Sequence, residues 1–223
     1  MSRIVFDIET VGVDFEGLDK SSQESLLKNA KTEEEQQAIK DCLALSPLTG
    51  KIVAIGMVDY DTNDGVVFFQ SSNGKDKDFK ENNSKYIVCS EKEIIENFWK
   101  IVTKYTQIVT YNGRGFDCPF IMLRSAAHRC KPTRDIMPYR FDIKSHIDLY
   151  DQMTFYGSMR KGFSLHMVTQ ALGIKSPKEE GVSGAMVSDL FKQEKSIDIA
   201  RYCLRDVRAT KELCEIWQQY IKP

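Results

Sequence analysis

Short apolar stretches separated by polar turns dominate the first third of the chain. Residues 3–8, RIVFDI, form a bulky apolar run that predicts a buried strand ending at acidic residues. Residues 51–60 and 66–70 are two further apolar stretches. The turn DTNDG between them favours a hairpin, because Asn, Asp and Gly tolerate the positive φ that such turns need. These three segments predict an antiparallel meander.

Helical periodicity interrupts this meander and returns after it. In residues 19–45, Leu, Ala and Ile recur near helical spacing amid many Glu, Gln and Lys, which predicts a surface helical excursion. The other predicted elements are helices at 90–104, from 117 onwards and across 163–220 with a loop at 173–184, strands at 107–110 and within 146–153, and an exposed loop at 71–85.

This order of elements indicates the fold class. Three hairpin strands followed by strands that alternate with helices predict an α/β fold with a mixed five-stranded sheet, three strands antiparallel and then parallel strands, flanked by helices. A length of 223 residues suggests a single domain over 1–223, with a helical insertion at about 14–47.

Composition excludes several classes of protein. No apolar run approaches the roughly 18 residues that cross a bilayer, and no basic segment followed by an apolar one opens the chain. The six cysteines are widely spaced without a CxxC pair, which favours reduced thiols over a disulfide framework or a zinc site. We therefore expect a cytoplasmic protein without a membrane partner.

The net charge of −1 argues against a surface that is basic throughout. Positive charge is concentrated locally in residues 128–134 and in Arg160-Lys161. Such a patch can steer an anionic polymer, although a charge run is more often a solvated face.

The first acidic pair lies at the end of the first predicted strand. Asp7 and Glu9 are two residues apart, so both side chains leave the same face of the strand. Two like charges on a bulky apolar strand are costly, because each raises the proton affinity of the other unless a cation neutralises them. A D-x-E pair also arises by chance, and its place inside VFDIET is what favours a metal site.

Two further acidic positions have structural alternatives. Asp117 follows a glycine-containing turn and begins a predicted helix. Its side chain could either cap this helix or contact a metal. Tyr202 and Asp206 are four residues apart and share one helix face. A surface Asp206 paired with Arg201 or Arg205 is the alternative there.

Together the three segments resemble a known enzyme superfamily. VFDIET, NGRGFDCPF and YCLRDVRAT resemble, in order and spacing, the three motifs of the DEDD 3′-to-5′ exonucleases, which have the ribonuclease-H-like fold. Tyr202 matches the tyrosine-containing subclass, DEDDy; the histidine of the other subclass would occupy position 201, which is Arg. The chain looks most like stand-alone relatives of the proofreading domain of family-B DNA polymerases, with further likeness in SPLTGKIVAIG, HIDLYDQMTFYG and FSLHMVTQALGI.

The resemblance implies a role for each motif residue. Asp7, Glu9 and Asp206 would hold one divalent ion, Mg²⁺ or Mn²⁺, while Asp7 would also reach a second ion served by Asp117. Tyr202 would orient or help deprotonate the attacking water. The implied substrate is the 3′ end of nucleic acid, single-stranded DNA being favoured over RNA.

Other residues and functions compete with this interpretation. His166 is a possible base, although a structural histidine is more common, and Asp148 and Asn112 are expected to support the site. Segment 175–184 is only loosely like the family. A non-catalytic nucleic-acid-binding module, an endonuclease and a small-nucleotide phosphodiesterase are the competing functions.

Overall fold

One mixed sheet organises the protein, and its strands run in the order β4-β5-β3-β2-β1-β6-β7. The computed structural model describes residues 2–159, 161–175 and 184–222; Arg160 and most of the expected loop at 173–184 lie outside this range. The strands are β1 (Arg3–Gly12), β2 (Gly50–Asp59), β3 (Gly65–Phe69), β4 (Phe79–Glu81), β5 (Ser84–Val88), β6 (Gln107–Thr110) and β7 (His146–Asp148). The helices are α1 (Lys20–Leu27), α2 (Glu33–Asp41), α3 (Glu91–Val102), α4 (Asp117–Ala127), α5 (Leu149–Met153), α6 (Leu165–Ala171), α7 (Val187–Lys192) and α8 (Ser196–Tyr220), with short 3-10 turns η1 (Phe15–Gly17), η2 (Cys42–Leu45) and η4 (Gly184–Met186).

The expected α/β fold with a mixed sheet is confirmed. β1, β2 and β3 form the antiparallel meander, while β6 and β7 continue the sheet parallel to β1. The sheet has seven strands rather than five, because β4 lies within the segment expected to be an exposed loop and β5 begins at its end. The polar residues of this region conceal Phe79 and the nearby Tyr86, whose ring centroids are 4.3 Å apart, and β5 extends the sheet by pairing with β3.

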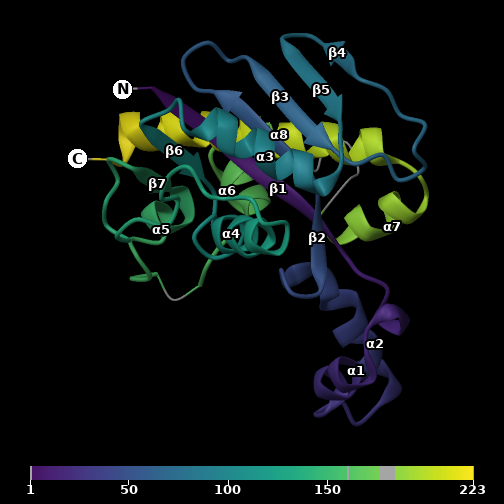
Figure 1. The fold of residues 1–223 in the computed structure, drawn as a ribbon. Coiled ribbons are helices and arrows are strands. Elements are labelled where there is room, and N and C mark those ends of the chain that lie inside the picture. The colour runs from purple at the N-terminus through teal and green to yellow at the C-terminus, as the bar shows by residue number, and fades with distance from the viewer. Residues whose placement is uncertain (1, 160, 176–183, 223) are drawn as a thin grey trace.

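Helices cover both faces of the sheet (Figure 1). The alternation of side chains along β1 separates two cores. Ile4, Phe6 and Ile8 join the core beneath α3 and α4, and Val5 joins the core beneath α8. Asp7 and Glu9 therefore lie on the α8 face of β1, where the strand alternation directs them.

Residues 14–47 leave the sheet between β1 and β2. Asp19 caps α1, and Thr32 and Glu35 form a capping box at α2. Neither helix has a buried residue, and both project from the body of the protein in Figure 1. Side-chain capping, rather than burial in the core, therefore stabilises the first turns of these two helices.

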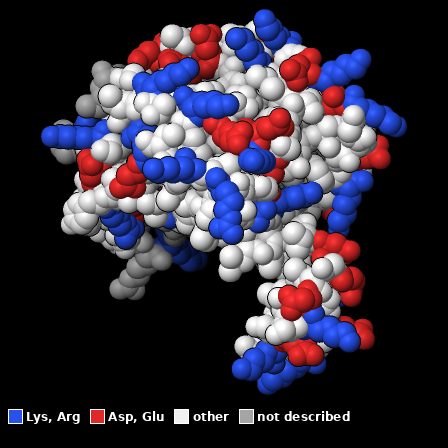
Figure 2. Space-filling view, viewed as in Figure 1, with Lys and Arg blue, Asp and Glu red and all other residues white. Residues whose placement is uncertain are grey.

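Charges of both signs are interspersed over the face shown in Figure 2. Part of the basic run at 128–134 has a structural role: Arg134 donates to the carbonyl oxygens of Val102, Tyr105 and Thr106. Among the described residues, no helix is long and apolar enough to span a bilayer.

Glu91, the first residue of α3, joins three elements through a buried carboxylate. It accepts hydrogen bonds from the Ile52 amide of β2 at 2.8 Å, from Arg124 of α4 at 2.7 and 2.8 Å, and from His128 at 2.7 Å. Burial raises the pKa of Glu91, but the bonds from Arg124, Ile52 and His128 outweigh it and hold the pKa below its usual value. The carboxylate is therefore stabilised in its ionised form.

We expect Glu91→Gln to destabilise the fold by about 2 kcal/mol at pH 7, because it leaves Arg124 without its charge partner. A lowered pKa means that this stabilisation is present above the usual Glu pKa of about 4.3 and is lost as pH falls through the folded value. Urea unfolding at pH 7 and at a series of pH values below 4 measures it. A difference between variant and wild type that did not shrink as pH fell below 4 would contradict the ionic origin.

Candidate functional site

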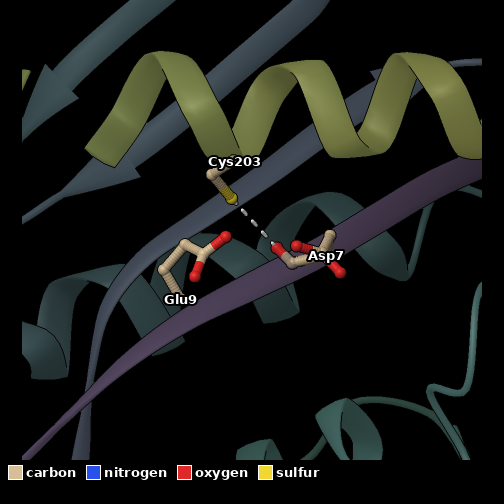
Figure 3. A group of neighbouring side chains, drawn as sticks. All are labelled: Asp7, Glu9 and Cys203. Atoms are coloured by element: carbon tan, nitrogen blue, oxygen red, sulfur yellow. Dashed lines mark hydrogen bonds between the residues drawn. The ribbon is translucent and has the colours of Figure 1, made fainter. Parts of the chain in front are cut away.

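The predicted site begins on β1, where Asp7 and Glu9 point toward α8 (Figure 3). β1 pairs with β2 in regular antiparallel register as far as Glu9, and the register shifts between Glu9 and Thr10. Glu9 is buried and Asp7 is partly buried. The strand therefore delivers two carboxylates to one side of the sheet.

Asp117 reaches the same place from α4. The N-cap of this helix is Phe116, and Asp117 is the first helical residue, so capping is not the role of its side chain. Its Oδ1 instead accepts a hydrogen bond from the Ile8 amide at 3.0 Å, across 109 residues of sequence. Because Ile8 lies between Asp7 and Glu9, this bond fixes the Asp117 carboxylate beside the acidic pair.

Helix α8 supplies Tyr202 and Asp206 from the opposite side. Tyr202 is buried, and its hydroxyl is hydrogen-bonded to Asp206. Arg201 forms an ion pair with Glu81 of β4 at 2.9 Å, so it is engaged away from Asp206. The structure thus brings together all five residues that the sequence singles out for catalysis.

The carboxylates of this site lie close enough together to raise one another's pKa values. Burial raises the pKa of Asp7 and Glu9 well above their usual values, and the neighbouring carboxylates Asp117 and Asp206 raise both further. Burial raises the pKa of Asp117 to about 7, in spite of its hydrogen bond from Ile8. Burial and the charges of Asp206 and Glu9 likewise raise the pKa of Tyr202. A cation bound among these groups would offset their mutual repulsion.

A comparison with protein families shows to which family the chain belongs. Residues 45–213 match the model of a family described as predicted 3′-5′ exonucleases related to the exonuclease domain of PolB. The chain belongs to this family. As a member of this exonuclease family it is a hydrolase that acts on nucleic acid.

A solved structure shares the fold of this exonuclease. It is the family B DNA polymerase from the hyperthermophilic archaeon Pyrobaculum calidifontis, which matches with a TM-score of 0.61 and 18% sequence identity. The match covers 97% of this chain but 24% of the polymerase chain, so the exonuclease spans about a quarter of that length. The likeness supports the architecture described above.

Cys203 is a member of the site that the sequence gives no reason to select. Ligand atoms of Asp7, Glu9 and Cys203 lie within 4.8 Å of one another, an arrangement able to hold a metal ion. The Cys203 thiol donates to the Asp7 carbonyl oxygen at 3.5 Å (Figure 3). Burial raises the pKa of this thiol well above its usual value, as do the charges of Asp7 and Glu9. A neutral thiol leaves carboxylate oxygens as the principal donors, and these suit hard cations.

Asp148 organises the loop that leads to Asp117. Its carboxylate accepts hydrogen bonds from the backbone amides of Asn112 at 2.9 Å, Arg114 at 2.8 Å and Tyr150 at 3.0 Å. Asn112 has a φ of 61°, a left-handed conformation that these bonds support. Both residues therefore shape the loop that leads to Asp117.

His166 lies on α6 and is partly buried. The strongest charges acting on Asp7 and Glu9 are those of other carboxylates. Tyr202, by contrast, is hydrogen-bonded to Asp206, which places Tyr202 beside the carboxylates.

Gly56 sets the distance between α8 and the sheet. It pairs with Asp7 across β1 and β2, and a Cβ at this position would approach the Cys203 sulfur to 3.0 Å and Val207 to 3.1 Å. A larger residue would therefore push α8, with Tyr202 and Asp206, away from Asp7.

Gly56→Ala should lower both stability and activity. We expect a loss of about 1–2 kcal/mol from overpacking, and a fall in nuclease rate of about tenfold or more because small misplacements of reacting groups are costly. Urea unfolding and a nuclease assay at saturating metal measure the two effects. Gly17→Ala is the matched control, since its Cβ would meet only ordinary contact at 3.9 Å. Equal effects of both variants would contradict the spacing role.

Proposed function

We propose that this exonuclease removes nucleotides from the 3′ end of nucleic acid by a two-metal-ion mechanism, that single-stranded DNA is its favoured substrate, and that it releases nucleoside 5′-monophosphates. The observation that carries the proposal is the convergence of Asp7, Glu9, Asp117 and Asp206 beside Tyr202, from β1, α4 and α8. RNA with a free 3′ end is the alternative substrate, since the same groups would act on it.

The donor set of the site fits two hard cations. Asp7, Glu9 and Asp206 would hold one Mg²⁺ or Mn²⁺, and Asp7 and Asp117 would hold the other. When bound, such ions supply the positive charge that activates an attacking water and stabilises a leaving oxygen in phosphoryl transfer. The mutual repulsion of the four carboxylates supports this fit.

Tyr202 would orient the attacking water. It is 4% exposed, and its hydroxyl already bonds to Asp206, so it presents a directed polar group at the edge of the carboxylates. In the proposed reaction the water oxygen forms a bond to the terminal phosphorus as the bond from phosphorus to the 3′ oxygen breaks. A proton goes to that 3′ oxygen, which leaves a strand shorter by one nucleotide and a nucleoside 5′-monophosphate.

The test uses purified protein with 5′-labelled single-stranded DNA and RNA of one sequence, in Mg²⁺, in Mn²⁺ and in EDTA. We expect a ladder of stepwise shortened strands with either ion, faster on DNA, and no cleavage in EDTA. Chromatography of the released products should give 5′-monophosphates.

Each competing function has its own outcome. No ladder on either polymer, with Asp7→Ala equally silent, would indicate a non-catalytic binding module. Cleavage of circular single-stranded DNA would indicate an endonuclease, since a circle has no 3′ end. Turnover of dinucleotides without polymers would indicate a phosphodiesterase.

A further inference from the structure

Three aromatic side chains beside β7 are exposed against the usual preference of aromatic residues. Tyr139, Phe141 and Phe155 are 74%, 53% and 56% exposed. The ring centroids of Tyr139 and Phe141 are 5.5 Å apart, and those of Phe141 and Tyr156, the residue that follows Phe155, are 4.5 Å apart. We call these four residues the aromatic surface. Exposed apolar patches of this kind mark interaction sites.

The backbone of this surface is held in an unfavourable conformation. Phe155 and Tyr156 have φ of 50° and 56°, in the left-handed region that bulky residues rarely adopt. The turn is fixed by the Tyr156 amide, which donates to the Asp151 carbonyl at 2.7 Å, and by Gln152, which donates to the Tyr156 hydroxyl at 2.7 Å. The Phe155 ring is exposed, so no burial in the core compensates for the strained backbone at this residue. Backbone strain of this kind is typical of functional segments.

The aromatic surface lies at the same end of the strands as the site. β1, β6 and β7 are parallel, so their carboxyl ends lie together, and α5 and the turn after it follow directly from the carboxyl end of β7. Arg114, in the loop before Asp117, donates to the carbonyl oxygens of Pro138 and Tyr139 at 2.7 and 3.2 Å. A direct hydrogen-bonded link therefore joins the site loop to the aromatic surface.

We propose that the aromatic surface binds unpaired bases of the nucleic acid strand whose 3′ end occupies the site; this inference rests on the proposed function. Rings that are exposed on one side and supported by a neighbouring ring can stack on any base, without sequence preference. Arg140 lies 6.0 Å from the Tyr156 ring centroid and is held by Asp151, and its side chain is 53% exposed, which places a cation beside the rings. Stacking needs free base faces, so the strand bound here is single-stranded.

The test compares a fluorescein-labelled (dT)16 strand with a thymidine trinucleotide as substrates of the Tyr139→Ala/Phe141→Ala double variant. We expect KM for (dT)16 to rise about tenfold or more, because each stacked base contributes a factor of about five upwards. The trinucleotide KM and both kcat values should stay within twofold of wild type. Tyr139→Phe/Phe141→Tyr should restore the wild-type KM. Tyr220→Ala is the matched control, since Tyr220 is 73% exposed at the far end of α8.

The outcomes separate this inference from the proposed function. A wild-type protein that cleaves neither substrate contradicts the proposed function itself. In that case anisotropy of the same strand still tests the surface, and equal binding by wild type and double variant overturns it. If wild type cleaves but the double variant has an unchanged (dT)16 KM, the aromatic surface does not bind the strand. An equal rise in KM for the trinucleotide also overturns the proposal, because it would place the effect in the site.

Discussion

Replacing Asp7 with asparagine should reduce the nuclease rate by at least about 10³-fold and, in EDTA, raise the melting temperature by about 4 °C. The loss of activity follows from the assignment of Asp7 to both proposed cations. The gain in stability follows from burial and from the neighbouring charges, which raise the pKa of Asp7 well above its usual value. An ionised Asp7 therefore opposes folding, and asparagine removes that charge.

The gain in stability from Asp7→Asn in EDTA should depend on pH. A raised pKa means that the folded state loses stability as pH rises through the folded value, relative to its stability below the usual Asp pKa of about 3.9. The advantage of Asp7→Asn should therefore be largest at neutral pH and fade toward pH 4. Thermal unfolding in EDTA across this range measures it.

Mg²⁺ should reverse the order of stability. The wild type gains stability from a ligand that binds its folded state, by an amount that grows with metal concentration, and Asp7→Asn should gain much less. Glu212→Gln, which alters an exposed acid on α8, is the control and should change neither stability nor rate. A variant that stayed active would contradict a metal role for Asp7, and one that was destabilised in EDTA would contradict the electrostatic origin of the stability gain.

The placement of Asp7 and Glu9 could be read from the sequence because it depends on local geometry alone. Side chains two apart on a strand share a face, and the apolar neighbours Ile4, Phe6 and Val5 establish that β1 is central and buried. Tyr202 and Asp206 share a helix face for a similar local reason. Their convergence with Asp7 came only from the resemblance between the motifs and a known superfamily.

The remaining features depend on contacts between distant segments. The bond from the Ile8 amide to Asp117 spans 109 residues, and no local pattern distinguishes it from a helix cap. The sequence alone predicts only a core or surface thiol at Cys203, and the contact with the Asp7 carbonyl is visible only in the folded structure. Gly56 reads as one small residue in an apolar strand, and its close approach to α8 is visible only in three dimensions. Polar residues around Phe79 and Tyr86 likewise conceal two strands.

Tyr202→Phe should lower kcat by about 10²-fold while leaving the metal requirement intact. The substitution removes one hydroxyl from a buried ring and keeps the carboxylates, so Asp7, Glu9 and Asp206 would still bind the cations. Loss of an oriented water would then appear in the chemical step. The affinity for metal, measured as the midpoint of a Mg²⁺ titration of thermal stability, should remain near that of wild type.

This pattern distinguishes Tyr202 from the carboxylates beside it. Asp7→Asn should remove both activity and metal-dependent stabilisation, whereas Tyr202→Phe should remove activity alone. Tyr111→Phe is a matched control, because Tyr111 is a partly buried tyrosine whose hydroxyl is also hydrogen-bonded, but to the Phe163 carbonyl in a neighbouring loop. If Tyr202→Phe kept its full rate, the attacking water would have to be oriented by the carboxylates alone. If instead it shifted the Mg²⁺ midpoint as strongly as Asp7→Asn, then Tyr202 would act by holding Asp206 in place, through the hydrogen bond that joins them.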